Sequence, residues 1–429
     1  MESDRQSPQW FNGILFPEVF RTFRLAMQPV KLIIAFMMIA VICLAGWLMD
    51  FSRTVVATPD TQYAVTELHK YLADPAQCER YVEAFEESGA RTGVFSTLWR
   101  FTATRYHSVL RSLFDLDFPA VAADIEDCVK ALGWAVRRHT LYCVVFFIIA
   151  HAAFSVAGGA ICRISALQFA QGEKPGLTEA MRFGLKKFPS LLAAPLVPVG
   201  TIAGAGLFIV LLGILGNIPR AGEIIVAAFL LFALIAGAFI AFVAIGAVAG
   251  FNLMFPAIAY DGLDCYDAIS RTFNYVYARP WRMGFYTALA ALYGSVCYVF
   301  VRLFTFLLIW LTRAFLGIGI WARDGSGISK LAMIWPEPRF GSLFGGPVPT
   351  PLEWSEMVAA ALIYLFLLVV AGTMVSFIVS FYFSGNTIIY ALMRQKVDHT
   401  PIENVSRPSI EYPNDAVFIH PSTNGSKQQ

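Results

Sequence analysis

The stretch Ile224–Phe255, which reads IIVAAFLLFALIAGAFIAFVAIGAVAGFNLMF, contains no charged residue. A helix needs roughly 20 apolar residues to cross the hydrocarbon core of a bilayer, so this stretch can cross it and still tilt or continue beyond it. The sequence therefore predicts a transmembrane helix here. Because one such helix places the chain in a bilayer, we consider the other long apolar stretches as transmembrane helices too.

Five further stretches have the same character. The chain of 429 residues is 57% hydrophobic and 14% charged, whereas soluble domains carry about 25% charged residues. We therefore predict an all-α, polytopic membrane protein with about six transmembrane helices. The other expected spans are Leu32–Met49, Leu141–Cys162, Leu191–Leu215, Gly284–Trp310 and Met357–Phe383.

Basic residues indicate how the spans are oriented, because Lys and Arg close to spans are retained in the cytoplasm. Both terminal segments and the links after spans two and four are rich in basic residues, which favours cytoplasmic termini. Arg137 and Arg138, in the long loop after span one, oppose this orientation. Bulky residues and Arg53 follow span one where a signal cleavage site would lie, so we expect an uncleaved anchor.

These expectations divide the chain into five parts. Residues 1–31 form a cytoplasmic amphipathic segment and residues 32–51 form the first transmembrane helix. Residues 52–138 form a helical extracytoplasmic cap. Residues 139–396 hold five transmembrane helices, with an outer Gly/Pro-rich loop near 317–353. Residues 397–429 form a cytoplasmic, partly disordered tail.

Three of the basic segments share one order of features: an acid, a short amphipathic helix with basic residues, a proline, and then a span. They begin at Glu18, Glu179 and Asp267 and reach Pro29, Pro189 and Pro280. An apolar face flanked by Arg and Lys suits a bilayer surface. Two interpretations follow: three repeated units, each an interfacial helix plus a transmembrane hairpin, or the ordinary placement of basic helices before spans.

The same segments resemble a diffuse bacterial group of multi-pass proteins. In Glu173–Pro189 (EKPGLTEAMRFGLKKFP) and Phe255–Trp281 (FPAIAYDGLDCYDAISRTFNYVYARPW), an acid–Ala pair opens the interfacial helix. In the second stretch, Pro256 ends the preceding span. The stretch Ile389–Arg394 (IYALMR) is similar to the group's closing Tyr-to-Arg motif, although Leu392 stands where an acid is often found.

This group includes uncharacterised proteins and the membrane domain fused to some glycerophosphodiester phosphodiesterases. The resemblance covers about half of the chain. It implies a bacterial cytoplasmic membrane, but the group's phosphodiester chemistry does not carry over, because the sequence shows no phosphodiesterase domain.

The cap is expected to hold three or four helices, because helical periodicity is visible in residues 64–72, 78–85, 95–113 and 121–132. So small a unit is marginally stable without a covalent link. Cys78 and Cys128 are its only cysteines, and disulfides persist outside the cytoplasm. We therefore predict a Cys78–Cys128 disulfide; the alternative is two buried free thiols.

The sequence shows no catalytic motif. HExxH, GxSxG and P-loop patterns are absent, as are CxxC pairs and Asp or Glu inside the expected spans. Ion-coupled transporters place carboxylates at depth, so that class is disfavoured. We expect no cofactor, no metal and no enzymatic activity.

A few residues remain as candidates. Arg302 lies well within span five and is either an anion or lipid contact or a snorkelling side chain. His151 is either a proton relay or an interhelical hydrogen-bonding group. Pro195 and Pro198 either break span three beside a site or form a tolerated kink.

Glycine pairs mark expected sites of close helix packing. Gly200 and Gly204 lie in span three, and Gly246 and Gly250 lie in span four. GxxxG spacing lets two helix backbones approach closely. The short link at Gly216–Glu223 forces these spans into an antiparallel hairpin, so we expect their small faces to meet.

The leading functional hypothesis is a non-enzymatic scaffold or component of membrane or envelope organisation. The alternative is a transporter or channel-like protein for a lipid or small solute, and the third is an accessory subunit of a lipid-metabolising enzyme. The expected partners are the bilayer and anionic headgroups at its cytoplasmic face; a net charge of +2 gives no field for nucleic acid. A polar cavity would favour the alternative, and a solid bundle would favour the scaffold.

Overall fold

The computed structural model describes residues 16–57, 66–85, 90–321, 329–340, 343–344 and 353–406. Parts of the predicted N-terminal segment, outer loop and C-terminal tail lie outside these residues. Six of the described helices are long and apolar enough to cross a membrane, which confirms the all-α, polytopic prediction. They are α2 (Pro29–Met49), α7 (Thr140–Gln171), α9 (Phe188–Leu215), α10 (Gly222–Asp261), α12 (Pro280–Gly319) and α14 (Trp354–Val397).

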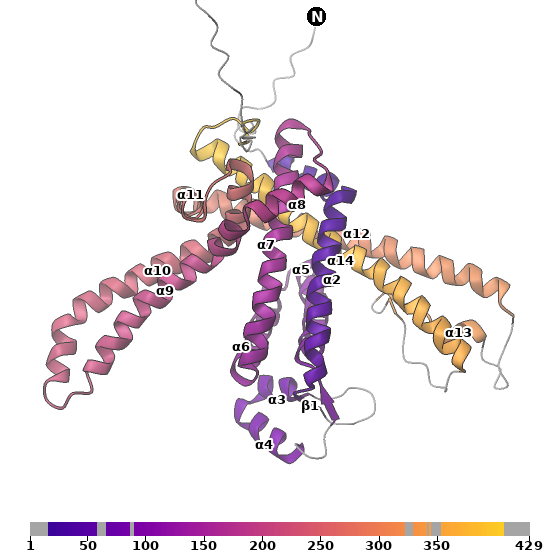
Figure 1. The fold of residues 1–429 in the computed structure, drawn as a ribbon, viewed down its shortest axis with the longest axis horizontal. Helices are drawn as coiled ribbons and strands as arrows, with labels where there is room; N and C mark the ends of the chain where they lie inside the picture. The colour runs from indigo at the N-terminus through magenta and orange to yellow at the C-terminus, as the bar shows by residue number, and fades with distance from the viewer. Residues whose placement is uncertain are drawn as a thin grey trace, which may run out of the picture.

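The six helices form three antiparallel pairs: α2 with α7, α9 with α10, and α12 with α14. Figure 1 shows the pairs diverging from a common region like arms. A short helix precedes each pair: α1 (Thr22–Ala26), which follows the 3-10 turn η1 (Phe16–Arg21), then α8 (Leu177–Lys186) and α11 (Cys265–Ala278). A proline occupies one of the first two positions of α2, α9 and α12. This is the order of elements in the three-unit interpretation.

The common region, which we call the hub, comprises residues 16–38, 155–194, 243–286 and 377–406. Most of the largest hydrophobic cluster lies in it, including Ile161, Tyr260 and Tyr390, none of which is exposed. Spans extend into the hub beyond their expected ends: α14 continues past Phe383 to Val397. The expected span was too short because residues 384–394 are polar in part and so end the apolar run. In the structure they remain helical and are buried by other parts of the protein.

Charged side chains tie the hub together. Asp261, at the end of α10, accepts hydrogen bonds from Arg271 and from the Tyr390 hydroxyl, each at 2.5 Å. Its other carboxylate oxygen lies 3.2 Å from Nε of Arg394. Lys31 is fully buried, and its ammonium donates to Oγ of Ser384 at 3.4 Å. Asp261 lies just past the apolar run Ile224–Phe255, outside the expected span, at the last position of α10.

The chain crosses the hub again after α14. Arg394 donates to the carbonyl of Asn404 at 2.8 Å, and Arg163 donates to the carbonyl of Ser406 at 2.8 Å. The Tyr260 hydroxyl donates to the carbonyl of Ile402. Residues 398–406 are therefore fixed by side chains of α7, α10 and α14, and this start of the tail is part of the hub.

The cap contains α3 (Glu67–Ala73), α4 (Pro75–Phe85), α5 (Val94–Phe114) and α6 (Phe118–Arg138), in line with the expected helices. It also holds an antiparallel ribbon, β1 (Val55–Ala57) with β2 (Ala90–Thr92), in which Val56 pairs with Arg91. Strands of three residues are too short to leave an alternating pattern. Asp50 accepts from the backbone N–H groups of Phe95 and Ser96 and so anchors the start of α5.

The cap is not a detached unit. The ring of Tyr106 in α5 packs edge-on against Tyr298 of α12, with centroids 5.3 Å apart. Tyr298 lies 18 residues into α12, roughly 27 Å along a helix that rises 1.5 Å per residue. Figure 1 shows α5 and α6 beside α2 and α7. The cap therefore reaches alongside the spans instead of resting on their ends.

The segment before α14 covers the third pair. It includes α13 (Lys330–Ile334), and Leu331, Trp335 and Leu343 pack with Tyr298, Ile309, Leu367 and Met374 in a second buried cluster. Tyr298 and Ile309 belong to α12, and Leu367 and Met374 belong to α14. The described part of the outer loop is therefore held against the pair it connects.

Candidate functional site

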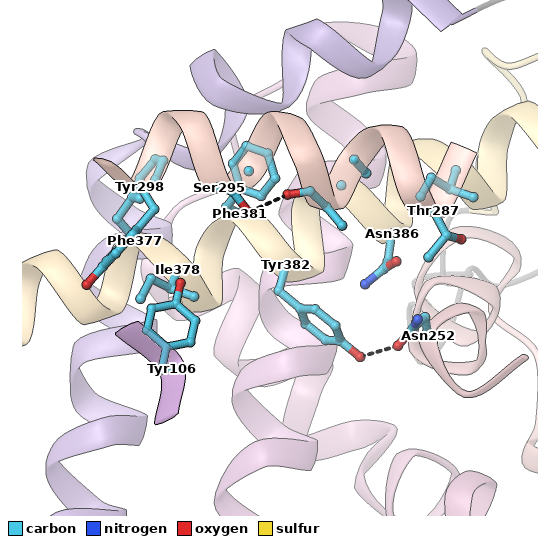
Figure 2. A pocket seen from close by; sticks show the side chains of 15 residues that line it. Tyr106, Asn252, Thr287, Ser295, Tyr298, Phe377, Ile378, Phe381, Tyr382 and Asn386 are labelled. Atoms are coloured by element: carbon cyan, nitrogen blue, oxygen red, sulfur yellow. Dashed lines mark hydrogen bonds between the residues drawn. The ribbon is translucent and has the colours of Figure 1, made fainter. Parts of the chain in front are cut away.

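A cavity of about 300 Å³ lies where the α12–α14 pair leaves the hub. Figure 2 shows the fifteen residues that line it. Most belong to α12 and α14, while Asn252 comes from α10 and Tyr106 from α5. The cavity is partly open to the surface. It is therefore bounded by two of the three helix pairs and by the cap.

Aromatic and aliphatic side chains of α14 form one wall. Phe377 and Ile378 lie one turn before Phe381, and the facing stretch of α12 presents Ala290, Ala291 and Gly294. A Cβ on Gly294 would lie 2.7 Å from the Phe381 ring, so only glycine permits this ring position. Small residues on α12 opposite large ones on α14 thus bring the two helices together while leaving space beside them.

Uncharged polar groups form the other side. The Tyr382 hydroxyl donates to Oδ1 of Asn252 at 2.5 Å and links α14 to α10 (Figure 2). Asn386 is only 7% exposed, and its amide makes no hydrogen bond to any described group. Because Asn386 lines the cavity, its amide offers free donor and acceptor groups there.

Arg302 lies behind the Tyr298 end of the cavity. It donates to the Tyr298 hydroxyl at 2.8 Å and, through Nη2, to the carbonyl of Phe340 at 2.7 Å. Its guanidinium also lies over the Phe340 ring, 5.2 Å from the centroid. Arg302 therefore contacts the segment that covers α12, and its contact with an anion or lipid stays a prediction.

The proline and glycine candidates lie away from the cavity. Pro195 and Pro198 are inside α9, whose helix runs without a break, so the predicted helix break is wrong. Gly246 and Gly250 approach Phe273 and Thr272 of α11, at 3.0 and 2.6 Å from the Cβ position.

Gly200 and Gly204 have no atom within 4 Å of a Cβ position, so the expected meeting of small faces between spans three and four is also wrong. GxxxG spacing permits close helix packing but does not specify which helix packs there.

His151 hydrogen-bonds the carbonyl of Leu192 at 3.0 Å, which confirms the interhelical interpretation.

The predicted Cys78–Cys128 disulfide is wrong, because both thiols are free. Cys78 lies on α4 and its thiol donates to the carbonyl of Glu67 at 3.6 Å, whereas Cys128 packs beside the cap core on α6. Burial raises the pKa of each thiol. The cap is held instead by a buried carboxylate: Glu67 accepts from the Trp134 indole N–H at 3.1 Å and lies 3.1 Å from His139.

Sequence reasoning missed the residues that make the cavity polar. It looked for carboxylates at depth, while the groups at this site are amides and hydroxyls. An asparagine in an otherwise apolar stretch, such as Asn252 in Ile224–Phe255, was an available signal. Among the described residues, no group of His, Cys, Asp and Glu could hold a metal ion.

Comparisons with known proteins add no assignment: no family model matches the chain, and no curated protein and no solved structure matches it significantly.

Proposed function

We propose that this protein binds a lipid or another small amphipathic molecule in the cavity between α10, α12 and α14, and that it handles this molecule within the membrane as a transporter or channel-like protein does. The observation that carries the proposal is the amide of Asn386, which lines a cavity with an apolar wall and makes no hydrogen bond to any described group. Pockets for small molecules are mostly apolar with a few placed polar groups. A diverging set of helix pairs with a polar cavity favours this function over a solid scaffold.

Filling the cavity tests the proposal. The intact protein is placed in phosphatidylcholine vesicles that contain one photoreactive lipid, with the same photoreactive acyl chain carried on diacylglycerol, phosphatidylglycerol or phosphatidylcholine in turn. We expect at least one of these lipids to label peptides of α12 and α14, and Ala291→Trp to suppress that labelling. Ala288→Trp is the matched control, since Ala288 is exposed on the same helix and does not line the cavity. Equal labelling of both variants would contradict the proposal.

The scaffold hypothesis remains the second candidate, supported by one observation. Gly200, Gly204 and Gly206 of α9 face open space, so a helix of another protein could pack closely there. Gly204→Leu would then weaken an assembly seen by crosslinking in native membranes, while leaving lipid labelling of the cavity unchanged. The accessory-subunit hypothesis is supported only by the resemblance of the basic segments.

We further propose that the hub lies on the cytoplasmic side of a bacterial cytoplasmic membrane. The support is a set of basic residues in the hub: Arg182 and Lys186 in α8, Arg279 and Arg282 just after α11, and Arg394 and Lys396 in the last turn of α14. Anionic headgroups would then be their neighbours. A reporter fused after residue 406 should be active in the cytoplasm, and a reporter inserted between residues 57 and 66 should be active outside. The reverse pattern would invert the topology.

A further inference from the structure

The cavity has an uncharged lining. Its polar groups, among the side chains that the structure describes, are amides and hydroxyls; they belong to Tyr106, Asn252, Thr287, Ser295, Tyr298, Tyr382 and Asn386. Resting on the function proposed above, we propose that the bound molecule is a neutral lipid whose headgroup carries hydroxyl or amide groups, not an anionic phospholipid.

The cost of burying charge excludes the anionic class. An ionised group taken from water into an apolar site needs a paired charge and hydrogen bonds. Arg302 touches the lining at Tyr298, and its guanidinium is already engaged by the carbonyl of Phe340 and the hydroxyl of Tyr298. A phosphate in the cavity would therefore lack a counter-charge from these groups.

The hydrogen-bonding inventory points to a group that both donates and accepts. Asn386 offers an amide oxygen and an NH₂ group, neither of which has a described partner. Because Tyr382 donates to Oδ1 of Asn252, the NH₂ group of Asn252 and the oxygen of Tyr382 remain for a ligand. Hydroxyls match such a mixed set, since each donates one bond and accepts two, while a phosphate diester only accepts.

The apolar wall indicates a lipid instead of a free polyol. Phe377, Ile378 and Phe381 line the side of the cavity away from Asn386 (Figure 2). A volume of about 300 Å³ lies at the small end of ligand pockets, which span roughly 300–1,000 Å³. It holds a headgroup and the start of a chain. The rest of the chain would leave by the open side into the bilayer.

The experiment compares headgroups on one acyl chain. The full-length protein in phosphatidylcholine vesicles is labelled with photoreactive diacylglycerol or with photoreactive phosphatidylglycerol. We expect diacylglycerol to label α12 and α14 on the order of 10-fold more. Asn386→Leu, which keeps the side-chain volume, should lower diacylglycerol labelling about 5-fold through the lost hydrogen bonds. Thr373→Val is the control, because Thr373 lies on α14 but outside the lining.

A second variant separates binding from folding. Tyr382→Phe keeps the ring and removes only the hydroxyl that orients Asn252, so it should also lower diacylglycerol labelling, while the melting temperature falls only slightly, since one hydrogen bond contributes about 0.5–1.5 kcal/mol. Equal or stronger labelling by phosphatidylglycerol, still suppressed by Ala291→Trp, would overturn the neutral headgroup but keep the proposed binding function. Labelling by neither lipid would overturn both. Suppression of diacylglycerol labelling by excess free glycerol would overturn the lipid in favour of a soluble polyol.

Discussion

Helix α10 belongs to two regions with opposite surroundings. Within the hub, its residues Leu253 and Tyr260 are fully buried, whereas further along the same helix Leu231 is 65% exposed and Leu234 is 62% exposed. The exposed part forms, with α9, a region of residues 196–242 that we call the α9–α10 arm; Figure 1 shows it extending away from the hub. Both regions are apolar in sequence, so hydrophobicity alone did not distinguish them.

The two regions differ in what their side chains contact. The hub buries Asp261, Arg394 and Lys31 and must satisfy their polar groups internally. The arm exposes almost only apolar side chains and leaves its surroundings to lipid. Specific polar contacts therefore fix how the three helix pairs meet, whereas within the arm the two helices need only each other and the bilayer. The predictions below test this contrast, from the largest expected effect to the smallest.

Removing the central carboxylate of the hub should have the largest effect. Asp261→Ala removes the carboxylate that accepts from Arg271 and Tyr390 and pairs with Arg394, and breaking a buried ion pair costs about 3–5 kcal/mol. We expect a large fall in the melting temperature measured in detergent. Glu126→Gln is the control: Glu126 forms an exposed pair with Lys130 on α6, and its loss should leave melting unchanged. Similar melting of both variants would show that the hub does not depend on its charges.

Adding one methyl group should separate hub from arm. A Cβ on Gly184 in α8 would lie 2.5 Å from the backbone carbonyl oxygen of Val156, so Gly184→Ala should destabilise the protein by about 1–3 kcal/mol. Gly204→Ala in the arm meets nothing within 4 Å and should be neutral or slightly stabilising, because alanine favours helix by up to about 1 kcal/mol. Melting of the two variants checks both signs. A destabilised Gly204→Ala would mean that the arm packs against something there.

Weakening the contacts between the α12–α14 pair and the segment that covers it should expose that segment to protease. Arg302→Gln removes donors to the carbonyl of Phe340 and should weaken the contact by about 1–3 kcal/mol. We expect faster trypsin cleavage at Lys330 or Arg339, with little change in the cleavage of the cap. Arg313→Gln, which loses a 3.0 Å bond to the carbonyl of Trp335, offers a comparison on the same helix. Unchanged cleavage in both variants would show that apolar packing alone holds this segment.

The smallest effects concern the thiols. Since Cys78 and Cys128 are free, reduction should not shift the mobility of the protein on a gel, and Cys78→Ala should behave identically. Burial raises both pKa values, so the reactive thiolates are scarce near neutral pH and alkylation should accelerate as the pH rises. Cys162, fully buried in the hub, should react only after unfolding. Rapid alkylation of Cys162 in the folded protein would mean that the hub opens readily.

The sequence by itself determined the number of spans and the order of elements. The length of an apolar run is a local property, so Ile224–Phe255 predicts a transmembrane helix whatever the rest of the chain does. The prolines at positions 29, 189 and 280 likewise marked where short helices end and spans begin, since proline lacks the N–H that a helix interior needs. The cap helices followed from periodicity for the same local reason.

Only the tertiary structure decided which residues meet. Asn252 and Tyr382 are 130 residues apart and share a hydrogen bond, and Asn386 becomes a candidate binding group because it lies near them and without a partner. The same glycine spacing is packed at Gly246 and Gly250 and open at Gly200 and Gly204. Long-range contacts depend on how three helix pairs converge on one hub. The local sequence pattern predicts that a residue is removed from water, but it does not predict which residue it contacts.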